Sequence, residues 1–373
     1  MSNPRPSTAP DFLLSRSHGS VRTQGSLETY TDAWDAAAAL KAGKHDMIVG
    51  ALPFLRDAPA ALTVPAQVIR EDGPLEPHSY YRMGPGSELS ARVTGFDPSP
   101  AEHVERVAAA VSTLSSTLLE KVVLARAVDI RFSTPVDPRL VAARLIDNSH
   151  NCDGFIADLS PVGRGFLVGS SPEVLIKRQG STVSAYPLAG SAPRVDDPVA
   201  DHLAGANLQA SAKDLSEHRF VVEHLQRILT PLCSSLSVPD QPELTKTDEM
   251  WHLATPIVGT LAQPTTALEL ALRVHPTPAI CGTPVDAAEA LIESVETPRG
   301  FYAGAVGWCD NAGDGEYMVA IRCAEVSPDG LTARAWAGGG IVSSSSPAAE
   351  LAETDAKLRT IMRALGLGSQ NRR

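Results

Sequence analysis

The chain has 373 residues, and its 43% hydrophobic and 20% charged content is typical of a globular protein. Lys and Arg number 32 against 43 Asp and Glu, and the formal net charge of −11 argues against a general nucleic-acid-binding protein. The five cysteines form no C-x-x-C pair and no run of 18 apolar residues occurs, so we expect a cytoplasmic protein with reduced thiols and no membrane span.

The first 26 residues are rich in Ser, Pro, Thr and Gly and show little periodicity. We therefore predict a flexible N-terminal segment over residues 1–26. Beyond it, the pattern predicts a helix over Ala33–Leu40 and strands over Met47–Leu52 and Gln67–Arg70.

Apolar residues spaced by three and four begin near Pro100 and predict an amphipathic helix, which runs into a strand over Lys121–Phe132. The helical stripe consists of Val104, Val107, Val111, Leu114 and Leu118. Further strands are predicted at Gly154–Leu159, Gly165–Val168, Glu173–Arg178 and Ser181–Tyr186.

The C-terminal half repeats this alternation of helices and strands. Helices are predicted over residues 200–229, 284–293 and 347–365, the last with Ser346 at its N-cap and Pro347 at N1. Strands are predicted at Phe301–Cys309, Tyr317–Val326 and Leu331–Ala337. Strand runs interleaved with long helices predict an α+β fold with large antiparallel sheets.

Two of the predicted helices carry pairs of acidic residues on one face. Asp214 and Glu217 are three residues apart, as are Glu350 and Glu353, and Lys357 shares the face of the second pair. Salt bridges alone would account for such residues, since Glu353 and Lys357 have the spacing of an exposed helical ion pair. Two helices with two carboxylates each also suit a hard cation, because Mg²⁺ binds a few carboxylates, waters and the oxygens of an anionic substrate.

Two cations lie on strands beside small apolar residues. Lys121 shares its strand face with Val123, Ala125 and Ala127, and Arg322 shares its own with small residues as well. A lysine in such a place either extends its ammonium to solvent or is desolvated, which favours the neutral amine of a general base. The arginine needs an anionic partner, either a protein carboxylate or a substrate carboxylate.

Glycine clusters at Leu188–Ser191 and Gly338–Gly340 follow predicted strands and offer close backbone approach to a ligand. By themselves they are weak indicators, and neither matches a P-loop. The chain also lacks H-E-x-x-H and G-x-S-x-G, so zinc-peptidase and serine-hydrolase interpretations lose support.

Eight strings in order nevertheless match one family pattern. They are Lys121–Arg126, Ser171–Leu175, Pro187–Ala192, Lys213–His218, His275–Gly282, Phe301–Asp310, Ala320–Cys323, and Ala337–Ile341 with Glu353–Lys357. The chain resembles the chorismate-utilising enzymes and, within them, the isochorismate synthases. The resemblance covers about residues 100–366 and is much weaker before residue 100.

The resemblance implies one large α+β domain over residues 27–373. In it, two packed antiparallel sheets are flanked by helices, with the active site between the sheets.

The resemblance also implies roles for individual residues in the Mg²⁺-dependent conversion of chorismate to isochorismate. Lys121 would activate water for attack at C2, and Glu173 would protonate the departing C4 hydroxyl. Glu217 and Glu353 would bind Mg²⁺, supported by Asp214 and Glu350. Substrate contacts would come from Gly190, Ser191, Ala279, Arg322, Gly338 and Lys357.

The implied partner is chorismate alone, with neither nucleic acid nor membrane and without a glutaminase subunit. We expect a monomer that contacts a downstream isochorismate-using enzyme only transiently, in siderophore, menaquinone or salicylate synthesis. One departure from the family pattern is Gly339, where alanine is usual, and Ser343–Ser346 lacks acidic residues often found there.

Relatives that use ammonia usually lack the lysine found at Lys121, so its presence favours water as the nucleophile. Salicylate synthases share the lysine and go on to eliminate pyruvate, and they are the alternative within the family. The alternative from another class is a non-catalytic binding protein of the same pathway. Retention of Lys121, Glu173 and both acidic pairs argues against it.

Overall fold

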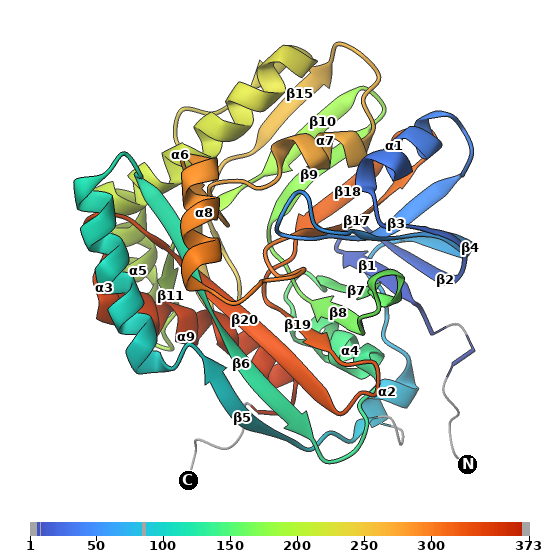
Figure 1. The fold of residues 1–373 in the computed structure, drawn as a ribbon, viewed down its shortest axis with the longest axis horizontal. Coiled ribbons are helices and arrows are strands. Elements are labelled where there is room, and N and C mark those ends of the chain that lie inside the picture. The colour runs from blue at the N-terminus through green and yellow to red at the C-terminus, as the bar shows by residue number, and fades with distance from the viewer. Residues whose placement is uncertain (1–5, 8, 84–86, 368–373) are drawn as a thin grey trace.

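The computed structural model describes residues 6–7, 9–83 and 87–367, and every strand pairing in it is antiparallel. Seventeen strands form one large sheet and three form a small one (Figure 1). The prediction of an α+β fold built on antiparallel sheet is confirmed. Within the described residues, no helix is long and apolar enough to cross a membrane.

The large sheet is a continuous ladder that bends back on itself. Its first half runs through β12 (Cys233–Ser237), β15 (Ile257–Leu261), β10 (Thr182–Tyr186), β9 (Val174–Gln179), β18 (Gly315–Val319), β17 (Ala305–Asp310) and β3 (Met47–Leu52). The connecting strands are β4 (Ala61–Asp72), β2 (Gly19–Tyr30) and β1 (Phe12–Arg16). The second half runs through β7 (Gly154–Asp158), β8 (Phe166–Gly169), β19 (Cys323–Val326), β20 (Thr332–Ile341) and β6 (Lys121–Phe132), with β5 (Ala91–Asp97) and β16 (Gly282–Thr283) both beside β6.

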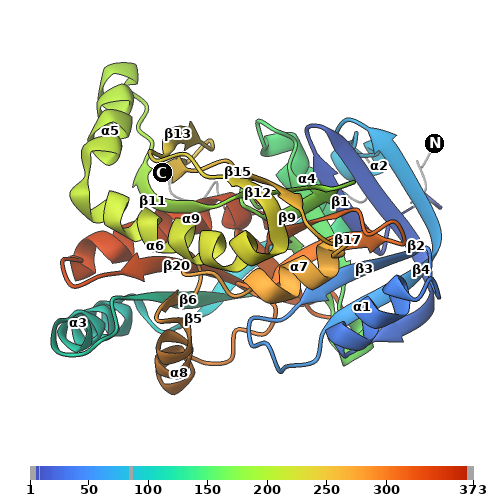
Figure 2. The same ribbon diagram turned by 90° about the horizontal axis from the view of Figure 1, so that it is seen from above.

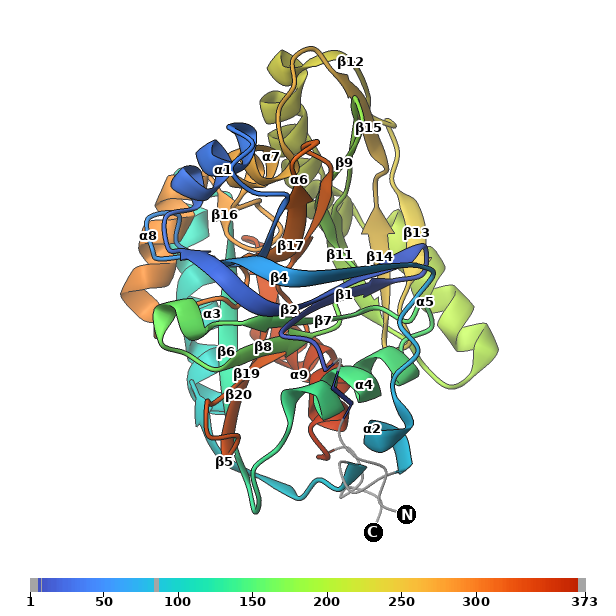
Figure 3. The ribbon, with the colours of Figure 1, turned by 90° about the vertical axis from the view of Figure 1, so that its right-hand side faces the viewer.

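The expectation of two separate large sheets is therefore corrected to one bent sheet. The physical reason is that β3, β4, β2 and β1 pair in succession, so that their ladders join β17 of the first half to β7 of the second. In Figure 3, β2 and β4 lie horizontally, whereas β6 and β17 lie roughly vertically. The small sheet has the order β11 (Leu188–Pro193), β14 (Met250–Ala254) and β13 (Glu243–Lys246).

Helices cover the outer surfaces of the sheets. They are α1 (Ala33–Lys41), α2 (Ser79–Met83), α3 (Pro100–Ser116), α4 (Pro138–Asn148), α5 (Pro198–Ala210), α6 (Ala212–Leu229), α7 (Ala267–Val274), α8 (Val285–Val295) and α9 (Pro347–Ala364). Figure 2 shows α6 and α8 on opposite sides of β6 and β20. One buried cluster unites both halves of the sheet, and a second joins the second half to α4 and α9.

Two predicted elements are broken in the structure. The long helix over residues 200–229 is interrupted at Ser211, which ends α5 and caps α6 by accepting the N–H of Asp214 on its hydroxyl. The strand over Tyr317–Val326 is interrupted at Arg322, whose φ is +51°. Through this left-handed residue the chain passes from the first half of the sheet to the second.

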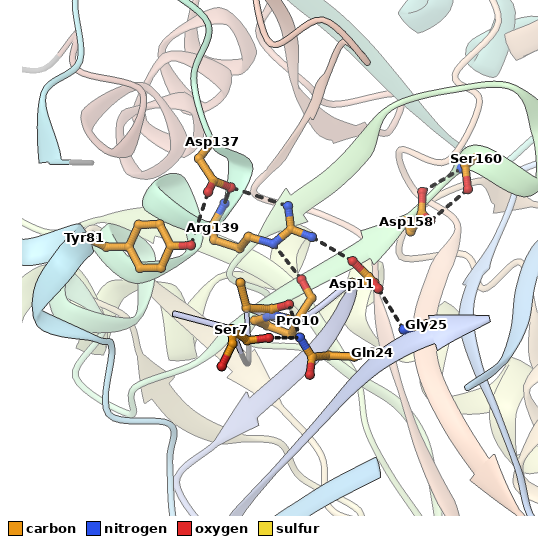
Figure 4. Close-up of polar contacts among 11 residues, drawn as sticks. Ser7, Pro10, Asp11, Gln24, Gly25, Tyr81, Asp137, Arg139, Asp158 and Ser160 are labelled. Atoms are coloured by element: carbon orange, nitrogen blue, oxygen red, sulfur yellow. Dashed lines mark hydrogen bonds and ion pairs between the residues drawn. The ribbon is translucent and has the colours of Figure 1, made fainter. Parts of the chain in front are cut away.

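The prediction of a flexible segment over residues 1–26 is wrong for residues 12–26, which form β1 and most of β2. Around the start of β1, Arg139 donates hydrogen bonds to the Pro10 carbonyl at 2.7 Å and to Asp11 Oδ1 at 2.9 Å (Figure 4). Gln24 donates to the carbonyls of Ser7 and Ala9 at 2.8 and 2.9 Å. The contacts of residues 7–11 thus use mainly backbone carbonyls, and residues 1–5 and 8 lie outside the described part.

Candidate active site

A cavity lies among the two halves of the large sheet, the small sheet, α6 and α9. Most of the residues predicted for the site line it together: Glu173, Gly190, Ser191, Glu217, Ala279, Arg322, Gly338, Glu353 and Lys357. Lys121, Asp214 and Glu350 are not among the lining residues. Residues of the matching strings that are far apart in the chain, such as Val123 and Lys357, thus meet in one place.

Lys121 begins β6 and is fully buried behind the cavity wall. Its Nζ lies 3.0 Å from Glu217 Oε1 of α6, but it donates no well-aligned hydrogen bond to any described group. The ammonium does not extend to solvent. Instead, Glu217, which lines the cavity, is the link between Lys121 and the enclosed space.

The tight packing around this ion pair explains one glycine of the Gly338–Gly340 cluster. A Cβ on Gly340 would lie 2.9 Å from Lys121 Cε and closer still to the Glu217 carboxylate. Any larger residue would therefore displace the pair.

Glu173 lies in the loop just before β9 and is 3% exposed. Burial raises the pKa of its carboxyl to about 7, although the Leu188 backbone N–H and the charges of Lys121, Lys357 and Arg322 act to lower it. A carboxylic acid that stays protonated near neutral pH is suited to donate a proton.

Glu350 and Glu353 of α9 are each matched by a lysine. Glu350 accepts a hydrogen bond from Lys213 Nζ at 2.9 Å, and Glu353 lies 2.6 Å from Lys357 Nζ and accepts a bond from Ser191 Oγ at 2.9 Å. Burial, together with the neighbouring charge of Glu353, raises the pKa of Glu350. Burial also acts on Glu353, but its pKa is lowered because Lys357, Ser191 and Lys213 outweigh that effect.

The carboxylates of α6 and α9 suit a cation that needs only one or two protein ligands. No group of three or more metal-ligating side chains is clustered within residues 6–7, 9–83 and 87–367. Mg²⁺, however, commonly takes one or two carboxylates and keeps several waters. Glu217 and Glu353 line the same cavity, and the buried Oε2 of Glu350 has no hydrogen-bond partner among the described residues. These observations are compatible with Mg²⁺ at the α6–α9 end of the cavity.

Arg322 supplies a positive charge that forms no close ion pair among the described residues. It is 5% exposed and lines the cavity, and its guanidinium makes no hydrogen bond or ion pair with the described residues. A buried guanidinium without an anion is costly, so a ligand carboxylate is the natural partner. Lys357 also lines the cavity and donates a hydrogen bond to the Gly338 carbonyl at 3.0 Å.

Three cavity residues escaped the sequence interpretation. His252 of β14 is buried with its Nε2 unpartnered among the described groups, and a lone histidine in a strand gave no signal for this position. Tyr302 and Trp336 stack with ring centroids 5.7 Å apart. Tyr302 could have been found, because it lies in the Phe301–Asp310 string.

Comparison with known proteins places this geometry in context. Residues 85–366 match the family model described as chorismate binding enzyme. The chain is 44% identical to the protein named MenF from Mycobacterium tuberculosis H37Rv, with 96% of each chain covered. It is 41% identical to isochorismate synthase DhbC from Bacillus subtilis, covering 92% of this chain and 87% of that one. The crystal structure of DhbC from Bacillus anthracis superposes with a TM-score of 0.87 at 35% identity, over 97% of each chain.

Proposed function

The chain belongs to the chorismate binding enzyme family and is an isochorismate synthase, an isomerase, and on that premise we propose that Lys121 and Glu173 are the base and the acid of its reaction. The single observation that carries the proposal is Glu173, a buried carboxyl in the cavity whose pKa is raised to about 7. Acid catalysis at neutral pH requires such a group.

In the proposed reaction, water attacks C2 of chorismate and gives a proton to Lys121, which has to be the neutral amine at this step. The ring double bond shifts, and the C4 hydroxyl departs as water with a proton from Glu173. Water therefore enters and leaves in equal number, and the reverse reaction uses the two groups in exchanged roles. Lys121 acts from behind the cavity wall, with Glu217 between it and the enclosed space.

Arg322 and Lys357 are proposed to hold the substrate carboxylates. Arg322 has no partner among the described side chains, which leaves its fork of donors free for bidentate binding. Gly190, Ser191, Ala279 and Gly338 line the same cavity and would contact the ring and its substituents.

We further propose Mg²⁺ as the cofactor, held by Glu217 and Glu353 with support from Asp214 and Glu350. When bound, Mg²⁺ supplies positive charge that neutralises a substrate carboxylate and orients the ring. Lys121, Lys213 and Lys357 balance the same carboxylates in the structure described here, and the side chains would share that task with the cation.

The test is the product formed from chorismate and Mg²⁺ with no other enzyme present. Isochorismate in equilibrium with chorismate supports the proposed chemistry. Salicylate with pyruvate would assign the chain to the salicylate synthases, and absence of turnover would favour a binding protein.

Because water is the nucleophile, we propose that the enzyme works without a glutaminase subunit. Its monomeric state, its cytoplasmic location and the pathway that consumes isochorismate stay predictions.

A further inference from the structure

The N-terminal strand β1 ends at an arginine that reaches the loop of the proposed acid. Arg16 donates a hydrogen bond from Nη1 to the Ser171 carbonyl at 3.2 Å. The two residues are 155 positions apart, and the Arg16 side chain is 14% exposed. No motif of the sequence marks Arg16.

The loop that Arg16 contacts leads directly to Glu173. Ser171 is buried, and its Oγ accepts the N–H of Glu173 at 3.2 Å. The carbonyl of Glu173 accepts the N–H of Val319 from β18 at 3.1 Å. Pro172, between Ser171 and Glu173, lines the cavity and limits the backbone of the loop. The position of the acid thus depends on Ser171 on one side and on β18 on the other.

Arg16 is itself held by two buried carboxylates. Its Nη1 lies 3.0 Å from Asp153 Oδ1, and its Nε lies 3.4 Å from Glu316 Oε1 of β18. Asp153 and Glu316 are 6% and 3% exposed. Glu316 has further cationic neighbours, with His18 Nε2 at 3.1 Å and Lys177 Nζ at 3.9 Å from its Oε2. A guanidinium between two such anions is restricted in orientation, because moving it would leave a buried charge unpaired.

We propose that Arg16 is a positioning residue for the isomerisation, held by Asp153 and Glu316 so that it fixes the Ser171 carbonyl and, through Ser171, the carboxyl of Glu173. The inference rests on the proposed role of Glu173 as the acid. It gives β1 a part in the reaction, although β1 contributes no residue to the cavity. Misplacement of a reacting group by about 1 Å can cost about 100-fold in rate, so a distant support can matter for turnover.

The experiment compares Arg16→Met with Arg22→Met in the full-length enzyme with Mg²⁺. Arg22 lies on β2 opposite Leu13 of β1 and pairs with Glu71 at 2.9 Å, but it does not contact the Ser171 loop. We expect Arg16→Met to lower kcat about 10- to 100-fold, with KM for chorismate within about twofold. Arg16→Lys should recover part of kcat, because it keeps the charge and one donor, and Arg22→Met should leave both constants unchanged.

A kcat of Arg16→Met equal to that of Arg22→Met, or a loss confined to KM, would overturn the inference. Arg16→Met leaves Asp153 with a buried unpaired charge, so folding is checked by circular dichroism. If the variant does not fold, Arg16→Lys and Ser171→Ala test the same path, and normal kcat in both overturns it.

Glu173→Gln, measured in parallel, separates the two proposals. Near-normal turnover in Glu173→Gln removes the proposed acid and the premise of the inference. Loss of turnover in Glu173→Gln with unaffected Arg16 variants leaves the proposed function intact and removes only the positioning role.

Discussion

The N-terminal strands β1–β4 and the part of the chain from residue 100 onward differ in what their sequences reveal. The later part carries eight recognisable strings, and nearly all of the cavity residues come from them. β1–β4 carry none, yet they connect the two halves of the large sheet. Motifs that line a cavity can therefore be recognised in a sequence, whereas the strands that hold the two halves together carry no pattern beyond that of ordinary buried strands.

The same comparison separates two kinds of N-terminal contact. Arg139 ties the start of β1 to α4 and lies away from the cavity lining, whereas Arg16 contacts the loop that bears Glu173. Variants at these positions and at the motif residues can therefore test whether a residue supports the fold or takes part in the chemistry.

The largest effect is expected for Glu173→Gln. The amide keeps the shape of the side chain but has no proton to give to the leaving hydroxyl, so kcat should fall by about 10²–10⁴-fold. Steady-state conversion of chorismate, followed by separation of the two isomers, measures it. Substrate affinity should survive, and a variant with near-normal kcat would contradict the assignment.

The pH dependence should give the next largest effect. Burial raises the pKa of Glu173 to about 7, and the proton is needed for catalysis, so kcat/KM should fall about tenfold per pH unit above that value. The contribution of Glu173 to the free energy of unfolding should also fall as the pH rises. The contribution of Glu173 is fully present below its ordinary pKa of about 4.3 and is lost as the pH rises through 7. A flat kcat/KM profile between pH 6 and about pH 9 would contradict the role of Glu173.

A smaller effect is expected for Gly340→Ala. The added methyl would meet the Lys121 and Glu217 side chains, so the pair must shift, and kcat should fall about 10- to 100-fold without global unfolding. Gly339→Ala is the matched control, because its Cβ would meet only the Glu350 Oε2 at 2.9 Å and Thr354 Cγ2 at 4.0 Å. Equal rates for the two variants would remove the packing argument for Gly340.

The smallest effect on turnover is expected for Arg139→Met. The variant loses the bonds to Pro10 and Asp11, so the free energy of unfolding should fall by about 1–3 kcal/mol. Its kcat should stay within about twofold of the parent enzyme. Urea unfolding with parallel assays measures both, and a large loss of kcat would show that β1 acts on the reaction through more than Arg16.

Much of the candidate site was predicted from the eight strings that resemble one family, and two of its residues also stood out by their surroundings, although salt bridges would have explained them as well. Glu217 continues an apolar helix face, and Arg322 follows small residues on a strand. The structure places both in the cavity with Glu173. Elements with strong periodicity were also predicted closely, and the strands over Met47–Leu52 and Lys121–Phe132 agree with β3 and β6 at both ends.

Other features depended on contacts between distant segments, which no local pattern encodes. Ser211 divides a continuous helical pattern because its hydroxyl caps α6, and Arg322 divides a strand because the chain changes halves of the sheet there. The bend of the sheet, the burial of Lys121 behind Glu217 and the reach of Arg16 to Ser171 were decided by tertiary structure alone. The sequence by itself determined the chemistry available to this enzyme, because residue type sets what a side chain can do. Only the packing of distant strands decided which of those side chains meet and how each is supported.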